Sequence, residues 1–305
     1  MRYLVGIDGG GTRTTVVVAE EGGREILRRT GAAGLVDPRQ PAESAAELVL
    51  LVRQALSETA LDAPPAALCA GLAGVGNLEE REVVRSTLAA ASLAQRVHVI
   101  SDGEIALEGA FLGGPGILLI AGTGSVAYGR GEDGRIERCG GWGMLVGDEG
   151  SGYAIGRGAL AAALRAVDGR GANTWLLPTF LEHLGLSGPR GIPPWAGRAE
   201  KREIAALVPQ VVRVAEEGDG VARELLQREA RELAQHAIAL VHRLGPWSAE
   251  PPAVFFGGVF GSRIFAQLVH GAILAELPGI KLREPAADAV AGALRYAARC
   301  LDSQP

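Results

Sequence analysis

The stretch "YLVGIDGGGTRTTVVVAE" (residues 3–20) decides the fold. An apolar run ends in Asp8, three glycines follow, and a second run rich in Val and Thr comes after them. A Walker loop reads GxxxxGK[ST], and a Rossmann fingerprint needs a helix directly after its glycines. Neither pattern fits, because β-branched residues favour a strand at that point. The stretch therefore predicts a β-hairpin with a glycine-rich tip.

The tip of this hairpin is a candidate phosphate site. Gly10 and Gly11 allow backbone N–H groups to face an anion with no Cβ in the way. Thr12 adds a hydroxyl donor and Arg13 a positive charge. Asp8 would face Mg²⁺ through water, because this ion keeps much of its hydration shell. The alternative is a plain glycine-rich turn that binds nothing.

A similar pattern returns in "GILLIAGTGSVAYGR" (residues 116–130), again an apolar run, a small-residue turn and a second β run. Many loops contain GTGS, so the turn alone is a weak signal. Paired with the first hairpin, it indicates an internal repeat and a second phosphate turn. Its candidate donors are Gly122, Thr123, Gly124 and Ser125.

The remaining sequence alternates strands and helices, which is typical of the α/β class. The pattern predicts two domains, residues 1–114 with 288–305, and residues 115–287. Helices are expected at 42–59, 79–91, 103–111, 220–244 and 288–300, with a Pro/Gly-rich interruption at 185–198. Strands are expected at 96–102 and 280–285, and residues 66–76 and 253–262 are each expected to form a strand that ends in a glycine-rich turn.

Asp102 stands at the carboxyl end of a predicted strand, "RVHVISD" (residues 96–102). Ligands of α/β sheets gather at such strand ends. A carboxylate there can take a proton from a hydroxyl that attacks a γ-phosphate. Asp102 is therefore the candidate general base. The alternative is that Asp102 is the N-cap of the following helix.

The most distinctive string is "CGGWGMLVGDEGSGYAIG" (residues 139–156). Its glycines, Gly143 among them, leave backbone open to a ligand. Trp142 can stack on a sugar face, and Asp148 and Glu149 can accept hydrogen bonds from sugar hydroxyls. The alternative is that the two acids cap the helix that begins after them.

Two further stretches carry small residues. "FFGGVFGS" (residues 255–262) predicts a strand followed by a turn, where Gly257 and Gly258 offer bare backbone to a flat adenine. The alternative is a simple strand-to-helix turn. "DAVAGALRYAA" (residues 288–298) has small side chains that suit close helix packing, and we assign it a structural role.

Composition excludes several functional classes. The net charge of −5, without a basic block, argues against nucleic-acid binding. No apolar run reaches the ~20 residues of a membrane span. The three cysteines form neither a disulfide framework nor a CxxC pair, which indicates a reducing, cytoplasmic setting. A homodimer is expected, as the commonest assembly of soluble enzymes.

Together these strings, with "EEGDGVA" (residues 216–222), resemble the BadF/BadG/BcrA/BcrD ATPase family, and within it the N-acetylglucosamine kinases. The resemblance implies two ribonuclease-H-like (actin-like ATPase) domains with an interdomain cleft for nucleotide and sugar. It implies ATP and Mg²⁺ as cofactors and phosphorylation of an amino sugar at its 6-hydroxyl, with N-acetylglucosamine as first choice. By motif, Asp102 matches the base, Gly10, Gly11 and Thr12 the first phosphate turn, Thr123 and Gly124 the second, Gly258 the adenosine turn, and Trp142 and Asp148 the sugar-side loop. To these the sequence pattern itself adds Arg13, Gly122, Ser125 and Gly257 as nucleotide contacts, and Asp102, Gly124, Gly143 and Glu149 as sugar contacts.

One stretch departs from the family pattern. "TGAAGLVDP" (residues 30–38) has Ala32 and Gly34 where Pro and a sugar-contacting Asn usually stand. A pocket without a polar partner discriminates less sharply, so glucosamine kinase and broad-specificity hexokinase stay open.

Two further classes are alternatives. One is an ATPase that activates a CoA-ester dehydratase or reductase, which needs a set of cysteine ligands that Cys69, Cys139 and Cys300 do not evidently form. The other is a non-catalytic sugar or nucleotide sensor, which the presence of Asp8 and Asp102 disfavours.

Overall fold

A computed structural model gives the structure of the chain and describes residues 2–11 and 13–302. The chain folds into two compact units. Unit 1 comprises Met1–Gly114 and Glu284–Pro305, and unit 2 comprises Pro115–Arg283.

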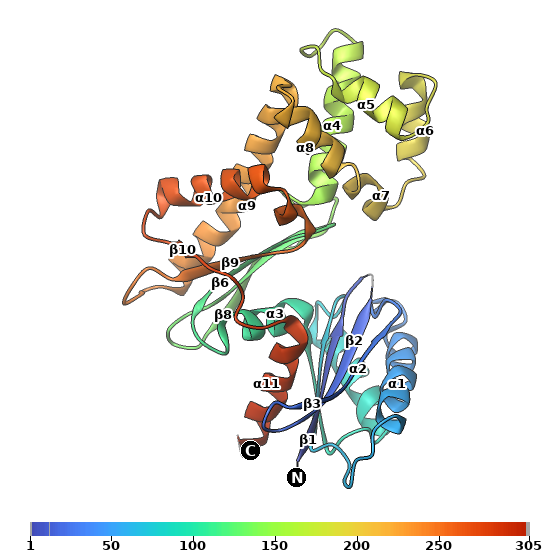
Figure 1. Ribbon diagram of the computed structural model, residues 1–305, viewed down its shortest axis with the longest axis vertical. Coiled ribbons are helices and arrows are strands. Elements are labelled where there is room, and N and C mark those ends of the chain that lie inside the picture. Colours follow the sequence, from blue (N-terminus) through green and yellow to red (C-terminus); the bar gives the residue numbers. More distant parts are fainter. Residues whose placement is uncertain (1, 12, 303–305) are drawn as a thin grey trace. The chain divides into compact units, whose positions relative to one another are not determined.

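Unit 1 is built on a five-stranded sheet with the order β3-β2-β1-β4-β5. Figure 1 labels β1, β2 and β3 of this sheet. The first three strands form an antiparallel meander, and β4 and β5 run parallel to β1. The predicted hairpin is confirmed, because Gly9 pairs with Thr14 across the glycine turn. The strands are β1 (Tyr3–Gly9), β2 (Thr14–Glu20), β3 (Glu25–Gly31), β4 (Ala67–Leu72) and β5 (Arg96–Ser101).

Helices cover both faces of this sheet, so its central strands are buried on both sides. Val16 and Val18 of β2 lie in the core that contains residues of α1 and α2, whereas Val17 and Ala19 pack with Val290 of α11. This two-sided burial explains the near-continuous apolar run of the opening stretch. The helices are α1 (Pro41–Ser57), α2 (Leu78–Ala90), α3 (Asp102–Phe111) and α11 (Ala289–Asp302).

Unit 2 repeats the same sheet. Its order is β10-β9-β6-β7-β8, in which β6, β7 and β8 form the antiparallel meander and β9 runs parallel to β6. The order and directions match those of unit 1, which bears out the internal repeat and the α/β class read from the sequence. The strands are β6 (Gly116–Ala121), β7 (Ser125–Arg130), β8 (Ile136–Gly140), β9 (Pro252–Phe256) and β10 (Lys281–Leu282).

Two expectations for unit 2 were wrong in detail. The Pro/Gly-rich stretch 185–198 contains a 3₁₀ turn and a short helix, because its prolines occupy first helical turns, where no backbone N–H is needed. The strand expected at 280–285 pairs over two residues only. The unit's helices are α4 (Gly152–Val167), α5 (Leu176–His183), α6 (Ile192–Ala196), α7 (Lys201–Ala205), α8 (Val208–Glu216), α9 (Gly220–Leu244) and α10 (Arg263–Glu276), with 3₁₀ turns at Pro189–Gly191 and Gly258–Gly261.

In unit 1, α3 and α11 approach each other backbone to backbone. A Cβ atom at Gly292 would overlap with the carbonyl oxygen of Ile105 and would lie 2.6 Å from the amide nitrogen of Gly109. A Cβ atom at Gly109 would overlap with the carbonyl oxygen of Asp288. The close packing expected of residues 288–298 is confirmed, and it fixes the helix that begins at Asp102.

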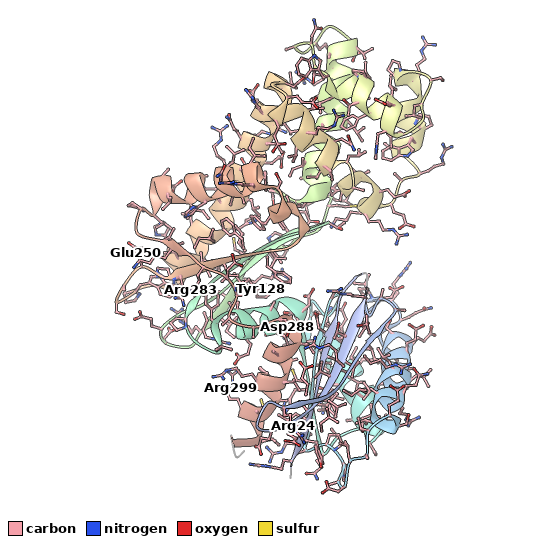
Figure 2. The ribbon with its side chains drawn as sticks, in the orientation of Figure 1. Arg24, Tyr128, Glu250, Arg283, Asp288 and Arg299 are labelled. Atoms are coloured by element: carbon pink, nitrogen blue, oxygen red, sulfur yellow. The ribbon has the colours of Figure 1, made fainter. Side chains whose placement is uncertain are left out.

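Charged side chains secure the same pair of helices. Glu108 of α3 is 1% exposed and forms ion pairs with Arg295 (3.3 Å) and Arg299 (3.1 Å) of α11. At the other end of α11, Asp288 accepts a hydrogen bond from the amide of Ala291 and pairs with Arg28 at 3.1 Å. Figure 2 labels Asp288, which directly precedes this helix, and Arg299, which lies within it. A buried carboxylate with two guanidinium partners is costly to disrupt.

The helix crossing gives a direct test with a matched pair of substitutions. Gly292→Ala should lower the free energy of unfolding by about 1–3 kcal/mol, because the new methyl group overpacks the contact with α3. Gly271→Ala in α10 should raise it by about 0.5–1 kcal/mol, because nothing lies within 4 Å of the added Cβ and Ala is the better helix former. Chemical denaturation of both variants measures the difference, and equal effects would contradict the close crossing.

Candidate active site

In unit 1, the register of the parallel strands brings two carboxylates to one edge of the sheet. On β1, Asp8 pairs with Gly71 of β4. Leu72, which follows Gly71, pairs with Ser101, the last residue of β5, and Asp102 comes directly after it. Asp8 near the end of β1 and Asp102 just beyond β5 thus lie at the same edge. The two strands are separated only by β4, so they run about 10 Å apart.

The electrostatics of Asp8 reflect this arrangement. Burial is the main cause that raises its pKa to about 6, and the negative charge of Asp102 raises it further. Arg13 acts in the opposite direction, and Asp288 adds a smaller repulsion. A carboxylate crowded by a second carboxylate is relieved by a cation, and carboxylate oxygens are ligands that Mg²⁺ prefers.

Asp102 is the first residue of α3 and is not its cap. Ser101 is the N-cap: its hydroxyl accepts from the amide of Glu104 at 3.2 Å, and Glu104 accepts from the amide of Ser101 at 2.8 Å. The alternative reading of Asp102 as the N-cap is therefore wrong. Its carboxylate accepts a hydrogen bond from the amide of Gly103 at 2.8 Å, and burial raises its pKa. Asp102 is thus a partly buried carboxylate just beyond the end of β5.

The first glycine turn is held by backbone hydrogen bonds and is open at its tip. The amide of Gly10 donates to the carbonyl of Arg13 at 3.0 Å, and the amide of Gly34 donates to the carbonyl of Gly10 at 3.1 Å. Nothing lies within 4 Å of a Cβ built on Gly11, so an anion can approach its backbone. Thr12 lies outside the described residues.

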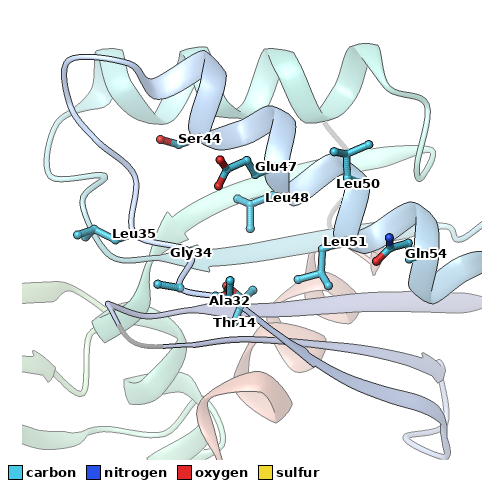
Figure 3. A pocket seen from close by; sticks show the side chains of 11 residues that line it. Thr14, Ala32, Gly34, Leu35, Ser44, Glu47, Leu48, Leu50, Leu51 and Gln54 are labelled. Atoms are coloured by element: carbon cyan, nitrogen blue, oxygen red, sulfur yellow. Dashed lines mark hydrogen bonds between the residues drawn. The ribbon is translucent and has the colours of Figure 1, made fainter.

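The loop that departs from the family pattern packs against this turn. A Cβ atom at Gly34 would overlap with the hydroxyl of Thr14 and lie 3.2 Å from the Cα of Gly9. An Asn side chain therefore has no room here. Figure 3 shows the cavity of about 200 Å³ next to this loop, between Thr14, Ala32 and Leu35 on one side and α1 on the other.

In unit 2, the second turn joins β6 to β7 and rests on the start of α4. The amide of Gly152 donates to the carbonyl of Gly122 at 2.8 Å, and the amide of Tyr153 donates to the carbonyl of Thr123 at 3.3 Å. Within the described part of the chain, no partner takes up the amide N–H of Thr123 or Gly124. These two donors are available to a ligand.

Asp148 supports this second turn through a hydrogen bond to its backbone. It is 3% exposed and adopts a left-handed conformation with φ of 61°, which Asp tolerates better than most residues. Its Oδ1 accepts from the amide of Ser125 at 3.3 Å, and its Oδ2 accepts from Lys201 at 2.5 Å. A sugar hydroxyl that contacts Asp148 must share these oxygens. The helix cap is Ser151, so the reading of the two acids as caps is wrong.

Glu149 and Trp142 are the more accessible members of the sugar-side string. The Glu149 side chain is 42% exposed and lies 3.5 Å from Nε2 of His236, whose own pKa is lowered by burial. Trp142 is 69% exposed, and the guanidinium carbon of Arg138 lies 4.9 Å from the centre of its ring. Gly143 has open space around it. These residues can reach a ligand without rearrangement of the core.

Gly257 and Gly258 lie next to the second turn. β9 is parallel to β6, with Phe256 paired to Ile120. Gly257 has φ of 108° and its Cβ position lies 2.7 Å from the carbonyl carbon of Ala121, so no side chain fits there. Nothing lies within 4 Å of a Cβ at Gly258. The predicted adenosine and phosphate turns are therefore neighbours at one sheet edge of unit 2.

Sequence reasoning missed Lys201, which pairs with Asp148 and lies beside Gly124 of the second turn. The signal available was compositional, since Lys201 is one of two lysines in a chain with 30 Lys and Arg residues.

Among residues 2–11 and 13–302, no group of three or more His, Cys, Asp or Glu side chains is arranged to hold a metal ion. In the same residues, no helix is both long and apolar enough to cross a bilayer.

The raised pKa of Asp8 predicts a pH-dependent penalty on stability. The folded-state pKa lies above the unfolded value, so ionised Asp8 destabilises the fold above pH ~6, and the penalty disappears as the pH falls toward ~4. Asp8→Asn should therefore stabilise unit 1 at pH 8 by about 1–3 kcal/mol. Denaturant titrations from pH 4 to 8 measure this gain. The exposed control Asp168→Asn should give no such pH-dependent gain.

Comparison with known proteins identifies relatives of this chain. The chain is 32% identical to the N-acetylmuramic acid/N-acetylglucosamine kinase of Clostridium acetobutylicum, over 86% of this chain and 87% of the relative. It is 29% identical to the N-acetyl-D-glucosamine kinase of Dictyostelium discoideum, over 95% and 96% of the two chains.

A solved structure from Chromobacterium violaceum, provisionally named an N-acetylglucosamine kinase, is 29% identical and superposes with a TM-score of 0.75 over 96% of this chain and 98% of that one. The fold class read from the sequence is confirmed by this likeness. The model of the BadF/BadG/BcrA/BcrD ATPase family matches residues 5–297. The chain belongs to the BadF/BadG/BcrA/BcrD ATPase family.

Proposed function

We propose that this protein transfers the γ-phosphoryl group of ATP to the 6-hydroxyl of an amino sugar, with N-acetylglucosamine as the favoured substrate. The observation that carries the proposal is Asp102. Its carboxylate is partly buried at the end of β5 and does not cap α3, because Ser101 is the N-cap. Two open glycine turns and the activities named for the relatives support it.

In the proposed reaction, Asp102 accepts the proton of the attacking hydroxyl. Burial raises the pKa of Asp102, which makes its carboxylate a stronger base than an exposed Asp. The amide of Gly103 donates to the same carboxylate and orients it. Phosphoryl transfer needs positioning and charge stabilisation more than covalent chemistry, so one oriented base suffices on the acceptor side.

The phosphate chain is assigned to the two turns. Gly10, Gly11, Thr12 and Arg13 are the proposed donors in unit 1, and Gly122, Thr123, Gly124 and Ser125 those in unit 2. Asp8 is the proposed Mg²⁺ carboxylate, through water, since the described residues offer no closed cage of ligands. Bound Mg²⁺ would neutralise charge on the phosphates. Gly257 and Gly258 present bare backbone to the adenosine.

The sugar is assigned to Asp102, Gly124 and the 139–156 string. We propose that Glu149 accepts directly from a sugar hydroxyl, because its side chain is 42% exposed. Asp148 contributes through the turn that it holds and through any oxygen lone pair that its partners leave free. Trp142 offers the ring face opposite Arg138, with the backbone of Gly143 beside it. A cytoplasmic location and a homodimer stay predictions from the sequence.

The assigned base is tested by Asp102→Asn. This variant keeps the shape of the side chain and loses the proton acceptor, so kcat should fall at least ~100-fold while KM for the sugar changes little. A coupled ADP-release assay measures both constants. Asp133→Asn, on an exposed hairpin, is the matched control and should keep full activity. Near-normal kcat in Asp102→Asn would rule out the assigned base.

The substrate class is tested on the unaltered protein. The same assay across N-acetylglucosamine, N-acetylmuramic acid, glucosamine and glucose should give the highest kcat/KM with N-acetylglucosamine. Comparable values across the panel would instead favour a broad hexokinase, in keeping with the missing Asn at position 34. ATP hydrolysis that no sugar stimulates would overturn the kinase proposal.

A further inference from the structure

Lys201 is an unusual residue in this chain. Of 30 Lys and Arg residues, two are lysine, Lys201 and Lys281. Lys281 is exposed in the edge strand β10. Lys201 is the first residue of α7, and its side chain is 32% exposed. In a chain whose basic residues are almost all arginine, Lys201 is thus a partly buried position that carries a compact ammonium group.

Close packing of α7 on α4 determines the position of Lys201. A Cβ atom at Gly156 of α4 would overlap with the carbonyl oxygen of Ile204, and one at Gly152 would lie 3.0 Å from the Cβ of Ala205. Two glycines on α4 therefore let α7 come within backbone contact. Because the amide of Gly152 also binds the second turn at Gly122, α7 and the turn share one support.

The ammonium group lies directly over the second turn. Its Nζ donates to Oδ2 of Asp148 at 2.5 Å and lies 2.9 Å from the position of a Cβ on Gly124. The turn's free amides, of Thr123 and Gly124, and this positive charge therefore converge on the same small region of unit 2. Each of them is a group that binds phosphate oxygens.

Pairing with Asp148 leaves part of the lysine unused. An ammonium has three donors, and one is directed at Asp148. Asp148 is also engaged by the amide of Ser125, so it is a fixed anchor. An arginine here would direct its planar fork at the carboxylate, whereas lysine remains a point charge with donors to spare. Among the described residues Asp148 is the one hydrogen-bond partner found for Lys201, so the structure holds a preoriented cation with donors left for a ligand.

We propose that Lys201 binds the phosphate chain of the nucleotide, together with the amides of Thr123 and Gly124, and that Asp148 positions it. This inference rests on the proposed kinase function, since it deepens the assignment of the second turn. Lys201 is then a nucleotide-binding residue that touches the phosphates, and Asp148 is a positioning residue that acts through it.

The first experiment uses the unaltered protein. Brief acetylation with acetic anhydride, read by mass spectrometry, reports the reactivity of Lys201 and Lys281 side by side. Saturating ADP should reduce acetylation of Lys201 at least ~5-fold, adenosine should not protect it, and Lys281 should react equally throughout. Unchanged reactivity of Lys201 under ADP that calorimetry shows to be bound would overturn the inference.

The second experiment compares Lys201→Met with Lys281→Met as the matched control. Loss of a charged hydrogen bond should weaken ADP binding ~10-fold or more and leave adenosine binding unchanged. Lys201→Arg, which keeps a charge near Asp148, should recover part of the ADP affinity. Equal loss of ADP and adenosine binding in Lys201→Met would mean a purely structural role and would sink the proposal.

The outcomes separate this inference from the proposed function. If the unaltered protein binds no ADP, both fail. If it binds ADP and phosphorylates a sugar while Lys201 stays unprotected, only the inference fails. If ADP protects Lys201 but no sugar is phosphorylated, the inference stands and the kinase assignment falls.

Discussion

Parallel pairing of strands is the constraint on which the candidate site depends. In unit 1, β4 and β5 run parallel to β1, so the ends of three strands meet at the edge where Asp8 and Asp102 lie. In unit 2, β9 runs parallel to β6 and brings Gly257 beside the second turn. Parallel strands require long crossovers, and the helices that supply them also bury both sheet faces. Each sheet edge can therefore be polar and open while its interior stays apolar.

Glycine residues serve two opposite purposes in this molecule. At Gly11 and Gly258 the space beyond the Cα is empty, which leaves backbone open to a ligand. At Gly257 and Gly292 the space is filled by another backbone, which lets elements meet closely. Sequence alone shows glycine in both cases. Only the surroundings distinguish a binding turn from a packing contact.

Much of the framework was readable from local pattern. β-branched residues after the glycines identified the opening hairpin, and the helix expected at 220–244 is α9, Gly220–Leu244. The position of Asp102 was also predictable, but its neighbour Ser101 proved to be the cap. The contact of Asp148 with Lys201 joins residues 53 apart, and no local signal encodes it. The two-residue β10 is short because pairing depends on a partner strand more than on propensity.

The return of the chain to unit 1 has a consequence for synthesis. α11 supplies Val290 and Gly292 to unit 1, so one face of that sheet lacks part of its cover until residues 289–302 have left the ribosome. Unit 2 is continuous from Pro115 to Arg283 and has all its core residues earlier. Domains generally fold as units when their sequence is complete. Unit 2 can thus finish folding first, while unit 1, which carries Asp102, waits until α11 has been synthesised.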